Sequence, residues 1–313
     1  MSQVVGASVD IGSNSVHLLV AGVNDHQLTA LTDESAFLGL GARVAEDGLL
    51  GAAARAELAM AVAGSVATAR DLGASVITVV GTEPIRRAAD GPSIVSEVGR
   101  VAGVPLHVLT HEEEAYLTVI GVTEGRLLAH EALVVDIGGG SSEFCLVGPD
   151  IPPRALGLRI GAGRLTQRLV AADPPTNDEI DAMRVEARRV LADAPVGAPR
   201  GIVAVGGTVS NLLKVVRYGA SEGTLSRTEL ERALALLAAE PSELAAKRHG
   251  IRPVRTRMLP AGAVIVEAIL DRYEADEVRV SDAGIRDGAI LAAAHAAHAW
   301  RDGLPVLAHG WRV

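Results

Sequence analysis

The chain has 313 residues, of which 49% are hydrophobic, 21% charged and only 2% aromatic, and its formal net charge is −9. This length predicts two domains, because one hydrophobic core rarely serves so many residues. The negative charge and the scarcity of side chains that stack on bases argue against general nucleic-acid binding, although a local positive pocket could still bind phosphate.

Three further features of the sequence bear on the cellular location that we expect for the protein. Charges such as Arg55, Glu57 and Arg70 interrupt the apolar segments, so no membrane-spanning helix is expected. The opening residues, MSQVV, lack a basic segment followed by an apolar core, which predicts no signal peptide. The single cysteine, Cys145, permits no internal disulfide, which is typical of the reducing cytoplasm.

In chain order, the first informative stretch is residues 9–15, VDIGSNS, where an apolar run ends in Asp10-Ile-Gly and small residues follow. The apolar run predicts a buried strand, and a second strand is expected over residues 15–20. Gly12 and the serines permit a sharp turn whose backbone N–H groups could contact a ligand. One such turn alone is weak evidence for a site.

The rest of the first half contains two segments of interest. Residues 39–48, GLGARVAEDG, predict a loop. Their G-x-G is a poor dinucleotide signal, because it does not join a strand to a helix as such a site requires. Residues 111–114, HEEE, stand at the head of a predicted helix that ends near residue 123. The other elements expected here are strands near residues 27–33, 76–80 and 106–109 and helices over residues 52–72 and 92–103.

The second half begins near residue 131 and repeats the opening. Residues 134–142, VVDIGGGSS, predict a strand that reaches Asp136, then a glycine turn and a second strand. Two such turns imply two similar half-molecules that face one anionic ligand. We therefore expect domains over residues 1–128 and 129–313, with the last helix able to pack back on the first domain.

Strands and helices continue to alternate through the second half. Capping boxes at residues 176–179 and 226–229 mark two helix starts. The expected elements are strands near residues 155–160, 202–205 and 277–281, helices over residues 161–170, 178–191, 206–215 and 285–300, and a long apolar segment over residues 258–273. This alternation predicts an α/β fold with mixed sheets flanked by helices in both halves.

The two Asp-Gly turns have a chemical interpretation and a structural one. Asp10 and Asp136 could hold Mg²⁺, with Mn²⁺ as the alternative, because Mg²⁺ needs only one or two carboxylates when phosphate supplies other ligands. Otherwise they merely end strands in Asx-turns, and the glycine turns bind nothing. The candidates for phosphate binding through backbone amides and hydroxyls are Gly12, Ser13, Asn14, Ser15, Gly138, Gly139, Gly140, Ser141 and Ser142.

Seven motifs follow one another between residues 10 and 291: DIGSNSVHLLV, TEPIRRAAD, EEEAYLTVIGV, VVDIGGGSSE, GAGRLT, AVGGT and GIRDGAIL. In this combination the chain resembles the exopolyphosphatase and guanosine pentaphosphate phosphohydrolase family, which belongs to the actin, hexokinase and Hsp70 superfamily. The resemblance implies two ribonuclease-H-like domains around a central cleft. It also implies the short two-domain form, without the additional C-terminal helical domains of longer members.

The resemblance implies roles for three charged residues. Glu114 corresponds to the family's catalytic glutamate, which would accept a proton from the attacking water or orient it, while the two preceding glutamates are explained by the helix dipole. Glu143 corresponds to a carboxylate near the metal and the water, although a strand residue could equally face solvent. Arg86 would neutralise a substrate phosphate, and Arg87 is expected to be a surface charge.

Two segments depart from the family pattern and leave the substrate preference open. Glu83-Pro84 replaces a small Ser-Ala pair, and Arg255-Thr256-Arg257 replaces Arg-Ala-Asp. The second departure lies in the densest basic run, residues 247–257, KRHGIRPVRTR, which is interpreted either as a path for a polyanion or as a solvated loop. The residues of this candidate path are Lys247, Arg248, Arg252 and Arg255.

We therefore expect a Mg²⁺-dependent hydrolase that releases the terminal phosphate of inorganic polyphosphate by positioning water, without a covalent nucleophile. Hydrolysis of guanosine pentaphosphate (pppGpp) is the alternative, and an actin-like nucleotide-binding module without turnover is a third hypothesis. The turn at residues 206–208 resembles the adenosine-binding position of the superfamily. Because the family commonly forms homodimers, a cytoplasmic homodimer is expected.

Overall fold

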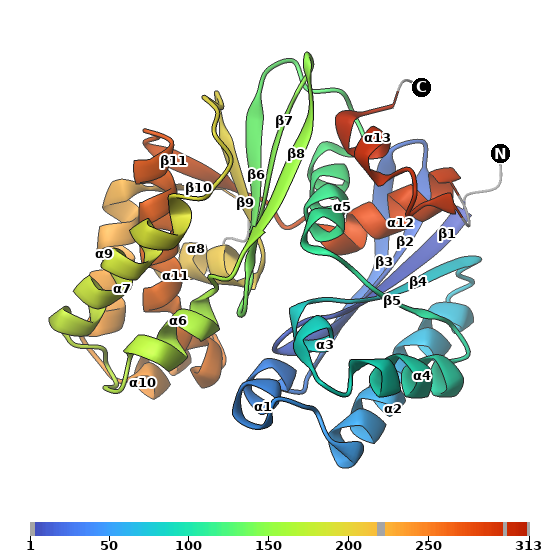
Figure 1. Cartoon of the computed structure of the whole chain (residues 1–313), viewed down its shortest axis with the longest axis horizontal. Helices are drawn as coiled ribbons and strands as arrows, with labels where there is room; N and C mark the ends of the chain where they lie inside the picture. Colours follow the sequence, from blue (N-terminus) through green and yellow to red (C-terminus); the bar gives the residue numbers. More distant parts are fainter. Residues whose placement is uncertain (1–3, 218–222, 297–298, 312–313) are drawn as a thin grey trace. The chain divides into compact units, whose positions relative to one another are not determined.

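Two compact units make up the chain in the computed structural model, which describes residues 4–217, 223–296 and 299–311. The first unit combines Met1–Leu128 with Ala283–Val313, and the second is Ala129–Asp282 (Figure 1). The sequence predicts domains over residues 1–128 and 129–313 and allows the last helix, over residues 285–300, to pack back on the first. In the structure the chain returns to the first unit at Ala283.

The first unit is built on a five-stranded sheet in the order β3-β2-β1-β4-β5. β2 is antiparallel to both β1 and β3, whereas β1, β4 and β5 are parallel to one another. The elements are β1 (Val4–Ile11), β2 (Ser15–Asn24), β3 (Gln27–Phe37), β4 (Val76–Gly81), β5 (Leu106–Val108), α1 (Leu40–Asp47), α2 (Ala52–Asp71), α3 (Glu83–Arg87), α4 (Gly91–Ala102), α5 (His111–Thr123), α12 (Ile285–Ala296) and α13 (Leu304–His309).

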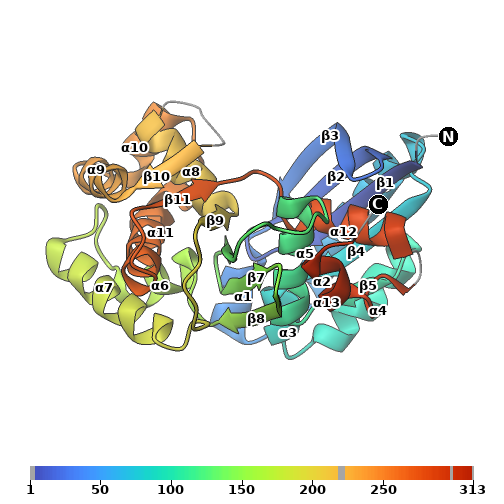
Figure 2. The same ribbon diagram turned by 90° about the horizontal axis from the view of Figure 1, so that it is seen from above.

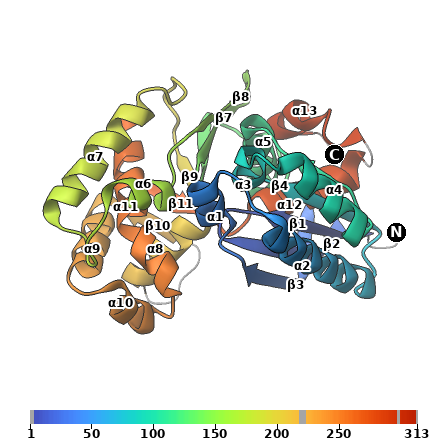
Figure 3. The same ribbon diagram turned by 60° about the horizontal axis from the view of Figure 1, so that its bottom comes forward.

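Helices cover both faces of this sheet. Alternate residues of β1, among them Val9 and Ile11, belong to a core that α2 and α4 complete. These two helices lie side by side in Figure 3. On the opposite face, Ile290 of α12 packs against Leu19 and Ala21 of β2. α5 packs against α12 and α13, and the three helices lie together in Figure 2.

Two glycines allow α5 and α12 to approach each other closely. A Cβ atom at Gly121 would lie 2.1 Å from the carbonyl oxygen of Gly284, and one at Gly288 would lie 1.8 Å from the carbonyl oxygen of Leu117. No side chain fits at such distances, so glycine is required at both positions. This close contact, together with the packing of α12 on β1, β2 and β4, holds α12 in the first unit.

A six-stranded sheet in the order β10-β11-β9-β6-β7-β8 forms the second unit. β6, β7 and β8 form an antiparallel meander, and β6, β9 and β11 are parallel, so the unit repeats the plan of the first with β10 added antiparallel at the edge. The predicted α/β class with mixed sheets in both halves is confirmed. The elements are β6 (Ala132–Ile137), β7 (Ser142–Gly148), β8 (Ile151–Leu158), β9 (Ile202–Val205), β10 (Gly223–Ser226), β11 (Glu277–Val280), α6 (Ala162–Leu169), α7 (Asn177–Leu191), α8 (Gly207–Arg217), α9 (Arg227–Ala238), α10 (Ser242–His249) and α11 (Pro253–Arg272).

The long helix α11 lies at the centre of the second core. It packs against α6, α7, α8, α9 and α10, and Figure 2 shows α7 beside it. Leu133, Val135 and Ile137 of β6 belong to the same core. Because side chains alternate along a strand, Asp136 points to the other face of the sheet.

One segment that the sequence assigns to a loop is helical, and a second, for which a solvated loop is one of two interpretations, is helical in part. α1 occupies most of residues 39–48, with Gly39 and Gly48 at its ends in the left-handed conformation. Two buried residues one turn apart hold α1 against the core, and this spacing was the signal that the glycines obscured. The basic run over residues 247–257 is not one loop either, because it joins the end of α10 to the start of α11.

The longest helices, α2 and α11, have 20 residues each. Within the part of the chain that the structure describes, no helix combines the length and apolar character needed to cross a membrane. The helix predicted over residues 285–300 ends at Ala296 as α12, and residues 297 and 298 lie outside the described residues.

Candidate functional site

In the first unit, three parallel strands end at one edge of the sheet, and each leads into candidate residues. The register places Ile11, Gly81 and Val108 side by side at the ends of β1, β4 and β5. The amide and the hydroxyl of Thr82 both donate to the Ile11 carbonyl, at 3.2 and 3.0 Å. The Leu109 amide donates to the Gly81 carbonyl at 2.9 Å. The carboxyl ends of such strands are the usual place for a ligand in an α/β fold.

The two Asp-Gly turns are closed by the same backbone hydrogen bond. In the first unit the Gly12 amide donates to the Ser15 carbonyl at 3.0 Å. In the second unit the Gly138 amide donates to the Ser141 carbonyl at 3.1 Å. The similarity that the sequence shows therefore extends to the backbone geometry of both turns.

The segment that enters α1 supports the first turn. The amides of Leu38 and Gly39 both donate to the Asn14 carbonyl at 2.9 Å, and the Gly41 amide donates to the Ser13 carbonyl at 2.7 Å. A Cβ atom at Gly41 would lie 2.9 Å from Cβ of Ser13, so this approach requires glycine. The G-x-G of this segment, dismissed as a dinucleotide signal, is thus part of the support for a candidate phosphate-binding turn.

Glu83 places a carboxylate beside the first turn. Its side chain is buried and accepts a hydrogen bond from the Ser13 hydroxyl at 3.4 Å. Arg87 forms an ion pair with Glu83 at 3.4 Å and donates to the Gly41 carbonyl at 2.9 Å. The prediction that Arg87 is a surface charge is therefore wrong, because this side chain is partly buried and ties α3 to α1.

Asp10 points to the face of the sheet that α12 covers. Its neighbours Val9 and Ile11 belong to the core on the opposite face, and side chains alternate along a strand. Its register partner on β2 is His17, and the positive charge of Arg286 on α12 acts on the same carboxylate. Because α5 packs on α12, the helix that carries Glu114 lies on this face as well.

The three glutamates at the start of α5 have three different environments. Glu112 is exposed, whereas Glu114 is buried. Glu113 completes a capping box: its carboxylate accepts from the Thr110 amide at 2.7 Å, and its amide donates to the Thr110 hydroxyl at 3.2 Å. Burial raises the pKa of the Glu113 carboxyl, but hydrogen bonds from Arg301 and the Thr110 amide outweigh this effect and lower the pKa below its usual value. The T-x-x-E pattern that announces this box was present in the sequence and was missed.

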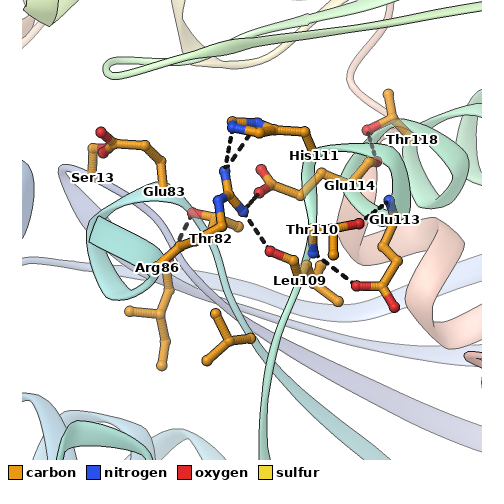
Figure 4. A network of polar contacts seen from close by, with 12 residues as sticks. Ser13, Thr82, Glu83, Arg86, Leu109, Thr110, His111, Glu113, Glu114 and Thr118 are labelled. Carbon is orange, nitrogen blue, oxygen red and sulfur yellow. Dashed lines mark hydrogen bonds and ion pairs between the residues drawn. The ribbon is translucent and has the colours of Figure 1, made fainter. Parts of the chain in front are cut away.

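Arg86 holds the buried Glu114 (Figure 4). Its Nη1 donates to Oε1 of Glu114 and to the Leu109 carbonyl, and its Nη2 lies 3.0 Å from Nδ1 of His111. The guanidinium donors form a rigid planar fork, so one arginine can fix several acceptors at once. Arg86 and Glu114, for which the sequence predicts separate roles, therefore form one ion pair in the structure.

In the second unit, Asp136 and Glu143 lie directly opposite each other. They are register partners on the antiparallel strands β6 and β7, so their side chains share one face of the sheet. Glu143 is buried, in contrast to the alternative that it faces solvent. Two carboxylates thus lie together at the end of β6, beside the second glycine turn.

The second turn packs against the start of α6. The amides of Ala162 and Arg164 donate to the carbonyl oxygens of Gly138 and Gly139, at 3.0 and 2.8 Å. A Cβ atom at Gly161 would lie 2.6 Å from the Gly139 carbonyl carbon, which explains why glycine precedes this helix. The GAGRLT motif is therefore the partner of the DIGGGSS turn.

Two polar side chains also support this turn. Nε of Arg164 donates to the Gly140 carbonyl at 2.7 Å. The Ser142 hydroxyl donates to the Ile160 carbonyl at 2.7 Å, which uses its one proton. In this arrangement the Ser142 hydroxyl is not a phosphate donor, contrary to the hypothesis from the sequence, and it fixes the segment that leads to α6.

The turn at residues 206–208 lies next to Asp136. Gly206 has a φ of 99°, and a Cβ atom there would lie 2.7 Å from Oδ1 of Asp136. A Cβ atom at Gly207 would lie 2.7 Å from Nη1 of Arg255. Both glycines therefore make room, one for a carboxylate and one for a guanidinium whose pKa is lowered by burial and by Arg252.

The four residues of the candidate polyanion path occupy different positions relative to this cluster. Lys247 and Arg248 lie in the last turn of α10, where Arg248 pairs with Glu240 at 2.9 Å. Arg252 is exposed at the start of α11. Arg255, within the first turn of α11, lies against Gly207 at the start of α8. The candidate path therefore combines three exposed cations with one partly buried cation, a difference that the sequence does not show.

The carboxylates at these strand ends fit a Mg²⁺ ion. Asp136 and Glu143 supply two carboxylates in the second unit, and Asp10 supplies one in the first. Mg²⁺ usually takes one or two protein carboxylates and completes its shell with water and phosphate. Each unit by itself thus offers hard oxygen ligands beside a turn of backbone amides, and the metal assignment stays a prediction.

Comparison with known proteins shows a match to one protein family. The sequence model of the Ppx/GppA phosphatase family matches residues 19–297. Exopolyphosphatase 1 of Mycobacterium tuberculosis (strain ATCC 25618 / H37Rv) is 28% identical over 303 residues, which cover 90% of this chain and 86% of that protein. Guanosine-5'-triphosphate,3'-diphosphate pyrophosphatase of Vibrio campbellii is 26% identical over 298 residues, which cover 91% of this chain and 58% of that protein.

Solved structures agree with this match. The crystal structure of the Aquifex aeolicus Ppx/GppA family member has a TM-score of 0.81 at 27% identity and covers 93% of this chain and 98% of that one. An exopolyphosphatase from Cytophaga hutchinsonii has a TM-score of 0.82 at 20% identity, covers 95% and 97% of the two chains, and supports the fold alone. The expected fold of two ribonuclease-H-like α/β domains is confirmed.

Proposed function

The chain belongs to the Ppx/GppA phosphatase family, and on that premise we propose that it is an exopolyphosphatase, which uses Mg²⁺ to hydrolyse the terminal phosphoanhydride of inorganic polyphosphate. The observation that carries this proposal is the buried Glu114 carboxylate held by Arg86 at the strand edge of the first unit. A carboxylate held in a fixed position where β1, β4 and β5 end, the edge from which the first glycine turn also leaves, is suited to activate water.

The chemical step requires little covalent work from the protein, because a phosphoanhydride already has a good leaving group. The oxygen of a water molecule attacks the terminal phosphorus, and the bond from phosphorus to the bridging oxygen breaks. Glu114 accepts the proton of the attacking water, and the shortened polyphosphate leaves with the bridging oxygen. Arg86 keeps Glu114 in place and adds positive charge for the phosphoryl oxygens.

The glycine turns would bind the phosphates. Backbone N–H groups in such turns form concave sites for anions. In the second unit the turn is held from behind by the start of α6, which leaves its amides fixed before the substrate arrives. Mg²⁺, for which Asp10, Asp136 and Glu143 are the candidate ligands, would neutralise the charge of the phosphoryl oxygens when bound.

Hydrolysis of pppGpp is the second candidate function, and the pyrophosphatase of Vibrio campbellii is the relative that favours it. The same terminal phosphoanhydride chemistry applies to both substrates. Arg255, which lies on α11 against the start of α8, is a position at which a larger substrate could meet positive charge. A homodimer and a cytoplasmic location stay predictions.

Phosphate release from polyphosphate, pppGpp and ATP under identical conditions tests the proposal. We expect the largest kcat/KM for polyphosphate, with Mg²⁺ required. A larger kcat/KM for pppGpp would make the second candidate the function. Binding of ATP without release of phosphate from any of the three substrates would instead favour an actin-like nucleotide-binding module.

A further inference from the structure

The C-terminal segment, residues 299–311, contacts the end of α5 that lies away from Glu114. α13 packs against α5 (Figure 2). The Trp311 amide donates to the Gly125 carbonyl at 3.0 Å, and a Cβ atom at Gly125 would lie 2.1 Å from the Trp311 ring. His26 and His295 flank this indole, with ring centroids 5.2 and 4.8 Å away. The segment is therefore packed against the backbone at the C-terminal end of α5.

The same segment also contacts the beginning of α5, through Arg301. Nη2 of Arg301 donates to the Val108 carbonyl and to Oε2 of Glu113, both at 2.7 Å, and its Nε donates to Oε1 of Glu113. The preceding residue, Trp300, is 5% exposed and packs edge-on against His107, with ring centroids 5.6 Å apart. These contacts place Arg301 at the first turn of the helix that carries Glu114.

Arg301 makes the same two kinds of contact as Arg86, but each of its partners precedes the partner of Arg86 by one residue. Arg86 joins the Leu109 carbonyl to the carboxylate of Glu114. Arg301 joins the preceding carbonyl to the preceding glutamate. Two arginines from distant parts of the chain thus tie the end of β5 to the first turn of α5.

Glu113 is held by two independent sets of donors. The Glu113 carboxylate takes part both in the capping box with Thr110 and in the ion pair with Arg301. The Glu113 side chain is only 18% exposed. Without Arg301, the Glu113 carboxylate would keep the capping box with Thr110 but lose the arginine that offsets its charge and ties it to the end of β5. Loss of this pair would therefore loosen the turn from which Glu114 projects.

We propose that Arg301 is a positioning residue for Glu114: by tying Glu113 to the end of β5, it fixes the rotation of the first turn of α5 and so the direction of the neighbouring carboxylate. This inference rests on the proposed role of Glu114 in hydrolysis. The family match ends at residue 297, so Arg301 lies beyond the matched residues and is assigned from the contacts of this chain alone.

Arg301→Gln, Glu113→Gln and the double variant test the proposal. In Glu113→Gln the new side chain keeps the capping box, since it also accepts from the Thr110 amide, but the ion pair with Arg301 is lost. We expect each single variant to lower kcat for phosphate release about tenfold, with KM within about twofold, because a small misplacement of a catalytic group is costly. The double variant should be no worse than either single variant, because both substitutions remove one interaction.

Two further variants separate positioning from general stability. Arg301→Lys keeps the charge and should recover part of kcat, although it cannot hold both acceptors with a planar fork. Arg55→Gln is the matched control, because Arg55 also pairs with two carboxylates of the first unit, Asp90 at 2.8 Å and Glu97 at 3.2 Å. It should lower the unfolding temperature without changing kcat at 25 °C.

Amide hydrogen exchange in the first turn of α5 gives a readout that does not depend on activity. Faster exchange there in Arg301→Gln, but not in Arg55→Gln, supports the proposal. Unchanged exchange with unchanged kcat would overturn it, as would an equal loss of kcat in both variants. If the wild-type protein releases no phosphate, the proposed function fails, and the exchange measurement alone decides whether Arg301 holds this turn.

Discussion

Arg86 and Glu114 form an ion pair at the carboxyl edge of the first sheet, and the same guanidinium nitrogen also donates to the Leu109 carbonyl. The two residues come from different elements, α3 and the start of α5, and meet because β4 and β5 are neighbours. A positive group predicted to bind phosphate thus holds the carboxylate predicted to activate water. If both predictions hold, the orientation of that carboxylate and the binding of phosphate are coupled through one side chain.

Arg86→Lys is expected to lower kcat about a hundredfold, because Lys keeps the charge but cannot hold Glu114 and the Leu109 carbonyl together. KM should also rise, since phosphoryl oxygens lose a bidentate partner. Steady-state phosphate release measures both effects. The control is Arg87→Lys, whose side chain contacts Glu83 and the Gly41 carbonyl instead of Glu114. If Arg86→Lys keeps the wild-type kcat, the pair has no part in the chemistry.

Glu83→Gln should lower KM for polyphosphate about threefold, because it removes a negative charge beside the turn at Ser13. Arg87 offsets only part of that charge across a 3.4 Å ion pair. The comparison with Glu112→Gln, which removes an exposed carboxylate, shows whether the effect is local. An unchanged KM in Glu83→Gln would mean that the first turn does not contact phosphate.

Asp136→Asn should raise the Mg²⁺ concentration needed for half-maximal activity about tenfold or more, because one anionic ligand becomes neutral. A titration of phosphate release against Mg²⁺ measures this shift. Asp150→Asn, at an exposed position of the same unit, should leave the titration unchanged. Full activity of the wild-type protein in excess chelator would contradict the metal assignment as a whole.

Substitutions in the basic run over residues 247–257 should have two different effects, depending on whether the cation is exposed or partly buried. Lys247→Gln with Arg252→Gln removes two exposed cations and should weaken long polyphosphate more than short, with a flatter salt dependence, because an extended polyanion releases counterions at each contact. Arg255→Gln should weaken long and short substrates alike, because Arg255, on α11, lies against Gly207 at the start of α8. Arg189→Gln, which removes a surface ion pair on α7, is the control. Equal losses on long and short chains in the first variant would exclude a polyanion path there.

The two glycine turns could be predicted from the sequence because their chemistry is local. An apolar run that ends in Asp-Ile-Gly determines both the strand and the turn, and the backbone bonds at Gly12 and Gly138 match. The repeated order of strands follows from the same repetition. For the same local reason the boxes at residues 176–179 and 226–229 were correctly predicted.

The contacts that select among neighbouring residues are not local, and the sequence did not reveal them. Nothing within HEEE itself distinguishes Glu114 from Glu113; their partners, Arg86 and Arg301, lie 28 and 188 residues away along the chain. The sequence allows the last helix to pack on the first unit, but it does not show the contact that α12 makes there, between Gly288 and the Leu117 carbonyl. Pairings over such separations are set by packing, which one sequence does not display.

The kcat of Glu114→Gln for phosphate release from polyphosphate tests the central claim most directly. Gln preserves the size of the side chain and an acceptor for Arg86, but it cannot take a proton from water. We predict a kcat lower by about 10²–10⁴-fold with substrate binding retained, whereas Glu112→Gln stays near the wild-type value. A Glu114→Gln variant with near-normal kcat would contradict the assignment of this carboxylate as the catalytic base.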